Sequence, residues 1–149
     1  MADTPPTPEQ VLDAHVAGFD RAMGFRFVTA TRDEVTIEYT VGPQHLQPYG
    51  IVHGGVHSGA IEVTCSVGAA LDAMTRGQSA VGLENHTSFI RAVREGTRVT
   101  VTATPITRGR RAQLWEASAR DDQGRVVATG RVRVLCLDPG SELGGERVR

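Results

Sequence analysis

The stretch Val56–Met74, VHSGAIEVTCSVGAALDAM, decides the fold of this 149-residue chain. Small and apolar side chains fill almost every position, so the stretch has no polar face to present to water. The pattern predicts one long helix, from about Gly54 to Thr75, that is buried on nearly all sides. Glu62 interrupts the apolar surface, and its carboxylate needs a partner because an isolated buried charge is strongly unfavourable.

His53-Gly54-Gly55 marks the start of this helix, nine residues before Glu62. The first N–H groups of a helix have no partner inside it and lie at its positive end. Glycines there let a substrate carbonyl approach closely, and one oxyanion donor contributes roughly 3–4 kcal/mol. The pattern therefore indicates attack on a carbonyl. It leaves open whether Glu62 attacks directly, giving a mixed anhydride, or takes a proton from water.

A helix without a polar face needs cover, and a curved antiparallel sheet supplies it. We expect an α+β fold in which a six-stranded antiparallel sheet wraps around a long central helix. Residues 1–8 are expected to be disordered, 9–137 to form a single domain, and 138–149 to form a flexible tail. The other predicted elements are a helix over 8–23 and strands over 25–31, 35–41, 80–91, 97–107, 113–120 and 126–137.

Composition excludes several classes of protein. The net charge of −1 gives no bulk signature for nucleic acid, and no apolar run reaches membrane-spanning length. The N-terminus has no secretory signal, so we predict a cytoplasmic location. Cys65 and Cys136 are expected to be small buried hydrophobes. Every cation is arginine, and between Arg91 and Arg133 ten arginines face four acids; such clustering favours phosphate binding.

The segment GIVHGGV at 50–56, followed by Glu62, resembles the signature of the PaaI-like acyl-CoA thioesterases, which have the hotdog fold. The resemblance covers about residues 20 to 137 and is greatest to the branch whose acidic residue is Glu. That branch contains 1,4-dihydroxy-2-naphthoyl-CoA hydrolases and 4-hydroxybenzoyl-CoA thioesterases. Further matching segments are VGLEN at 81–85, RAVREG at 91–96, RGRR at 108–111 and QLWE at 113–116.

The resemblance implies a role for each matching residue. Glu62 would be the nucleophile or general base, and Gly54 would donate the oxyanion N–H with His53 beside it. Gln47 would orient substrate or water, and Ser66 would hold water near the carboxylate. Gly82 stands where an Asp-type subgroup has a helper serine. The reaction would be hydrolysis of an acyl-CoA with an aromatic acyl group to the free acid and CoA, with no separate cofactor and no metal. The predicted substrate- and CoA-binding set is Gly55, Gly82, Ser88, Arg91, Arg108, Gly109, Arg110 and Arg111.

Helix geometry adds an expectation about assembly. Gly54 and Glu62 are eight residues apart, which is about 12 Å along a helix and about 80° around its axis. One Glu62 side chain cannot reach a carbonyl docked at the start of its own helix. We therefore predict at least a homodimer, in which Glu62 of one copy faces Gly54 of the other. The sequence does not distinguish a dimer from a tetramer.

Other interpretations stay open at this point. Glu62 could be a structural carboxylate paired with an arginine, and His53 could only cap the turn. His53 and His57 form an H-x-x-x-H pair, but zinc binding is disfavoured because His-Glu-x-x-His is absent. Two other functions are a hotdog dehydratase or hydratase, with His53 as its histidine, and a non-catalytic acyl-CoA-binding module. The sequence does not predict which acyl group the protein prefers. It also does not distinguish a pathway of menaquinone synthesis from one of aromatic degradation.

Overall fold

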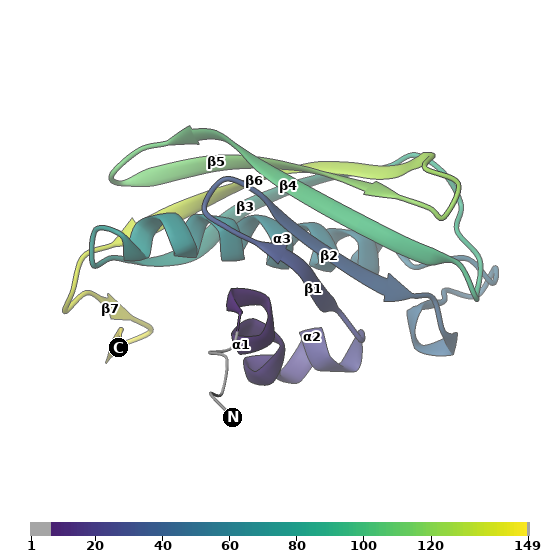
Figure 1. The fold of residues 1–149 in the computed structure, drawn as a ribbon, viewed down its shortest axis with the longest axis horizontal. Coiled ribbons are helices and arrows are strands. Elements are labelled where there is room, and N and C mark those ends of the chain that lie inside the picture. The colour runs from purple at the N-terminus through teal and green to yellow at the C-terminus, as the bar shows by residue number, and fades with distance from the viewer. Residues whose placement is uncertain (1–6, 149) are drawn as a thin grey trace, which may run out of the picture.

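The computed structural model describes residues 7–148, and six of its strands form one antiparallel sheet around a central helix (Figure 1). Five of the predicted strands are displaced by no more than two residues at either end, and the sixth matches at both. The order across the sheet is β1-β2-β4-β5-β6-β3. The strands are β1 (Arg26–Ala30), β2 (Val35–Thr40), β3 (Ser79–Phe89), β4 (Arg98–Arg108), β5 (Ala112–Arg120) and β6 (Val126–Leu137).

Helix α3 (Gly54–Met74) lies in the concave side of this sheet (Figure 1), which confirms the predicted fold class. Its apolar positions, among them the fully buried Ile61, pack against β-strand residues such as Ile37 and Trp115. The ring of Trp115 lies so close to Gly68 that a Cβ there would be 2.5 Å from it. Small residues on α3 thus allow the sheet to curve tightly over the helix.

The prediction of one helix over 8–23 is wrong, because the chain forms two helices there. Helix α1 (Pro8–His15) ends at Val16, whose φ of −58° and ψ of 125° are not helical, and α2 (Gly18–Ala22) begins at a glycine with φ +54°. Thr7 caps α1 in a capping box with Gln10. Residues 1–6 lie outside the described part.

The two edges of the sheet differ. At the β1 edge, the Asp13 carboxylate accepts from the Phe27 N–H at 2.8 Å, and the Glu9 carboxylate accepts from the Ala30 N–H at 3.0 Å. Helix α1 therefore satisfies outward-facing donors of β1. At the opposite edge, β3 has no second strand partner within residues 7–148. Apolar side chains are more than half exposed there, namely Leu83, Phe89 and Ile90. An open apolar edge is a natural pairing surface.

The far end of α3 holds a buried acid that the sequence analysis overlooked. Asp72 is fully buried and pairs with Arg76 at 2.8 Å and with Arg32 at 3.1 Å. Gln113 donates to the same carboxylate at 3.2 Å. The segment expected as a flexible tail contains a short hairpin, β7 (Glu142–Leu143) with β8 (Glu146–Arg147). No described helix combines the length and apolarity required to cross a membrane.

Candidate active site

The N-terminus of α3 has one N–H group that is available to a ligand. His53 is the N-cap of this helix, and its Nδ1 accepts from the Gly55 N–H at 2.8 Å. The Val56 N–H donates to the His53 carbonyl at 2.9 Å. Within residues 7–148, the Gly54 N–H has no hydrogen-bond partner. Gly54 rather than Gly55 is therefore the donor placed to meet a developing oxyanion.

The Glu62 carboxylate is half-buried and is held by two neutral donors. Ser66 Oγ, one turn further along α3, donates to Oε1 at 3.1 Å, and Asn85 Nδ2, from β3, donates to Oε2 at 3.0 Å. The carboxylate lies against the backbone of Gly82, where a Cβ would collide with Oε1. Among the described residues no guanidinium pairs with Glu62, which argues against the structural-carboxylate interpretation.

A pocket of about 260 Å³ opens beside the start of α3. Gln47, Gly54 and Arg91 contribute to its wall, so the structure brings these three predicted site residues together. The Phe89 ring covers Gly54 closely enough that a Cβ on Gly54 would lie 2.6 Å from it. Gln47 Oε1 accepts from the Tyr49 N–H at 2.5 Å, which leaves the Gln47 NH2 group facing away from that bond. The pocket thus combines an aromatic wall with an amide and a guanidinium.

His57 lies at the base of this pocket and was not assigned a role from the sequence. Its side chain is only 3% exposed, it packs near Phe89, and its Nδ1 has no hydrogen-bond partner. Burial lowers the pKa of His57 to about 4, so the imidazole is neutral near pH 7. No group of three or more potential metal ligands occurs within residues 7–148.

This burial predicts that His57 contributes to the acid sensitivity of the fold. Between pH 6.5 and 4 the unfolded chain takes up a proton on His57 before the folded chain does, so stability falls as the pH falls. From pH 7 to pH 4.5 we expect the wild type to lose about 2 kcal/mol more free energy of unfolding than His57→Gln. Urea unfolding of both proteins at the two pH values measures this difference. Equal losses would contradict the prediction.

The arginine loop lies at the opposite end of α3 from Gly54. Arg108 donates to Asp33 at 2.7 Å and lies 3.8 Å from Asp72, so carboxylates already compensate this guanidinium. Arg110 and Arg111 are exposed, and no ion pair to either is found within residues 7–148. Gly109 lies between Arg108 and Arg110 in a tight turn, in which its N–H donates to the Ala112 carbonyl. One copy of the chain therefore does not bring this loop to the pocket around Arg91.

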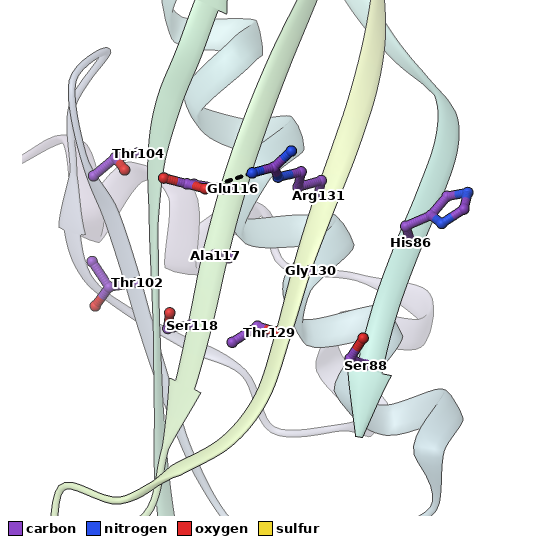
Figure 2. Close-up of a pocket in the computed structure, with 10 residues that line it drawn as sticks. All are labelled: His86, Ser88, Thr102, Thr104, Glu116, Ala117, Ser118, Thr129, Gly130 and Arg131. Carbon is purple, nitrogen blue, oxygen red and sulfur yellow. Dashed lines mark ion pairs between the residues drawn. The ribbon is translucent and has the colours of Figure 1, made fainter. Parts of the chain in front are cut away.

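A second hollow, of about 480 Å³, lies on the outer face of the sheet, with α3 behind the strands (Figure 2). Figure 2 shows Thr102, Ser118 and Thr129 across neighbouring strands and an ion pair between Glu116 and Arg131. Ser88 stands on this face, so the structure does not bring it to Glu62. Its assignment to CoA binding stays a prediction.

The structure shows the surroundings of the cysteines and of two further histidines. Cys65 and Cys136 are free and buried as predicted, and burial, followed by the charges of Glu62 and Glu116, raises the pKa of Cys65. His45 is a core residue, while His86 is exposed on β3. Asn85 was not predicted as a partner of Glu62. Its place in the segment VGLEN marked it as a strand residue, but strand alternation does not reveal a contact with a helix residue 23 positions away.

Comparison with known proteins agrees with this geometry. The Thioesterase superfamily model matches residues 49–128. A Mycobacterium tuberculosis protein named as an esterase is 39% identical over 136 residues, covering 89% of this chain and 96% of its own length. The 1,4-dihydroxy-2-naphthoyl-CoA hydrolase of Escherichia coli is 31% identical, with 84% of this chain and 88% of that protein covered.

A solved structure agrees as well. The thioesterase from Haemophilus influenzae superimposes with a TM-score of 0.81 at 26% identity, covering 91% of this chain and 93% of its own. The start of α3, Glu62 on that helix and the sheet wrapped around it thus occur in a chain that one family model matches over more than half of its length. The chain belongs to the thioesterase superfamily of hotdog-fold proteins and is a thioester hydrolase.

Proposed function

We propose that this protein hydrolyses acyl-CoA thioesters whose acyl group is aromatic, with Glu62 as the reacting carboxylate. One observation carries the proposal: Ser66 and Asn85 hold Glu62, which pairs with no cation within residues 7–148, and the same helix begins with the Gly54 N–H, which has no partner in that range. The aromatic preference rests on Phe89 in the pocket wall and on the similarity to a naphthoyl-CoA hydrolase.

The chemistry follows from these two groups. The thioester oxygen accepts from the Gly54 N–H while negative charge develops on it, and the Gln47 NH2 group stands in the same pocket wall. Either Glu62 attacks the carbonyl carbon and water then cleaves the anhydride, or Glu62 takes a proton from a water that attacks. In both routes the C–S bond breaks and the CoA thiolate leaves. We propose no cofactor or metal beyond the CoA of the substrate.

The site is proposed to be shared between two copies. Gly54 and Glu62 lie on one unbroken helix, so the spacing of about 12 Å along the axis applies. Glu62 contacts Gly82 and Asn85, both on β3, the edge that lacks a second strand partner within residues 7–148. Pairing of two β3 edges would place each Glu62 beside a subunit boundary. We propose a homodimer, or a tetramer of such dimers, in the cytoplasm.

The phosphates of CoA are proposed to bind arginines that lack carboxylate partners. Arg110 and Arg111 are exposed at the β4–β5 turn, and Arg91 lies at the pocket. Arg108 has a different role in this scheme, because its bonds to Asp33 and to the Arg32 carbonyl fix the base of the turn. A fixed base would reduce the entropy lost when the two exposed guanidiniums meet an anion.

A hydrolysis panel tests the proposal. Thiol release is followed with a thiol reagent for benzoyl-CoA, hydroxybenzoyl-CoA, acetyl-CoA, butyryl-CoA and palmitoyl-CoA, with Glu62→Gln as the matched control. We expect kcat/KM for the aryl esters to exceed that for the alkyl esters by about tenfold or more. Equal rates would contradict the aromatic preference. Binding without thiol release would favour an acyl-CoA-binding module, and hydration of crotonyl-CoA would favour a hydratase.

A further inference from the structure

Asn85 connects β3 to the reacting carboxylate through a chain of hydrogen bonds. Its Nδ2 donates to Glu62 Oε2 at 3.0 Å and to the Ser58 carbonyl at 3.0 Å. Its Oδ1 accepts from Thr87 Oγ1 at 2.7 Å. Asn85 and Thr87 are two residues apart on a strand, so both side chains project toward α3. The NH2 group and the oxygen of the Asn85 amide therefore both have hydrogen-bond partners on the inner side of β3.

The orientation of this amide is fixed by chemistry. The Ser58 carbonyl can only accept, so the NH2 group of Asn85 must face it, and the oxygen of the amide must face Thr87. The second N–H of the same group then points at Glu62. Ser66 supplies the other oxygen of the carboxylate with a donor from α3 itself. Each oxygen of Glu62 thus has one donor, and the two donors come from different elements.

We propose that Asn85, oriented by Thr87, is a positioning residue that holds the Glu62 carboxylate aimed at the substrate. The proposal rests on the proposed function of Glu62. A glutamate side chain has three rotatable bonds, and two donors on opposite oxygens restrict them far more than one donor does.

The surroundings of Glu62 isolate this effect. Among the described residues Glu62 takes part in no ion pair, and its titratable neighbours are few. Cys65, on the same helix, carries a thiol whose pKa burial raises, so it stays neutral. Glu84 and His86, on the same strand as Asn85, pair with each other, and Glu84 also pairs with Arg133. Replacing Asn85 with an uncharged residue therefore changes one donor without changing a charge.

The test compares Asn85→Ala and Thr87→Val with Thr129→Val, a matched hydroxyl-to-methyl change on the outer face of β6. For Asn85→Ala we expect kcat to fall about 10- to 100-fold with KM changed less than threefold. Thr87→Val should fall about three- to tenfold, and Thr129→Val should match the wild type. Urea unfolding of each variant separates a loss of positioning from a loss of folded protein.

A purely structural role would lower kcat only in proportion to the loss of folded protein, and that result would overturn the proposal. An activity-independent measurement uses glutamate labelled with ¹³C at Cδ, with Glu62→Gln to assign the Glu62 signal. We expect the chemical shift of this signal at pH 8 to change in Asn85→Ala and to stay unchanged in Thr129→Val, and an unchanged shift in Asn85→Ala would overturn the proposal. A wild type that hydrolyses thioesters, beside an unaffected Asn85→Ala, rejects this inference alone. An inactive wild type rejects the proposed function and this inference with it.

Discussion

Glu62→Gln is expected to lower kcat/KM for an aryl-CoA thioester about 1,000-fold or more, with little change in stability. The amide oxygen of glutamine can accept from Asn85 Nδ2, and its NH2 group can donate to Ser66 Oγ, so both contacts of the carboxylate persist. Only the negative charge and the basic lone pairs are lost. Thiol release together with urea unfolding separates the chemical effect from any effect on folding. A variant that keeps a tenth of the activity would exclude Glu62 as the reacting group.

The same variant also tests whether the site is shared between copies. In a homodimer with shared sites, mixing Glu62→Gln with Gly54→Val creates a heterodimer in which one site keeps both native residues. An equal mixture should then recover about a quarter of the wild-type activity, since half of the dimers are mixed and each has one intact site. Sites confined to one copy would recover nothing. The measurement requires subunit exchange, and an unmixed sample of each variant is the control.

Gly82→Ala is expected to lower kcat/KM about 100-fold while the free energy of unfolding stays within about 1 kcal/mol of the wild type. The added methyl group would collide with Glu62 Oε1. Because that oxygen is the end of a flexible side chain, it can move aside at little cost to the fold. The displaced carboxylate would then be misaligned with the carbonyl. Steady-state kinetics and urea unfolding of the variant measure the two effects.

A shorter acid provides the control for Gly82→Ala. Aspartate at position 62 withdraws the carboxylate from Gly82, so the methyl group has less to collide with. In the Glu62→Asp background we expect Gly82→Ala to cost less than tenfold, and the two changes are therefore non-additive. Additive losses would show that the methyl group acts through something other than Glu62.

Part of this site could be predicted from the sequence because it depends on positions along one helix. The glycines at the start of α3 and Glu62 two turns later fix a relationship that any regular helix must keep. The sheet followed from the apolar surface that needed cover. Asp72 was missed because an aspartate near a helix end usually lies in water, whereas here Arg32 and Arg76 converge on it from separate elements.

The remaining errors in the sequence prediction come from contacts between distant segments and, at the break between α1 and α2, from the backbone angle of one glycine. Asn85 and Glu62 meet only because β3 lies beside α3, and a one-residue shift in strand register would separate them. The break between α1 and α2 depends on the positive φ of Gly18, since Val11, Leu12, Val16 and Phe19 alone fit one continuous helical spacing. In the arginine loop, the sequence showed the clustered cations but not that Asp33 and Asp72 already neutralise Arg108.

The carboxylates of Glu9 and Asp13 determine how far self-association can proceed. They occupy the N–H groups that a further strand would need along β1, so a sheet built from this chain can extend in one direction only. If two copies join through β3, that remaining direction is used up on both sides at once. The assembled sheet then ends in two sealed borders, and fibre-like growth by strand addition stops at two. Hydrogen bonds to Glu9 lower its pKa, so the bond from the Ala30 N–H to the ionised Glu9 carboxylate persists further into mild acid.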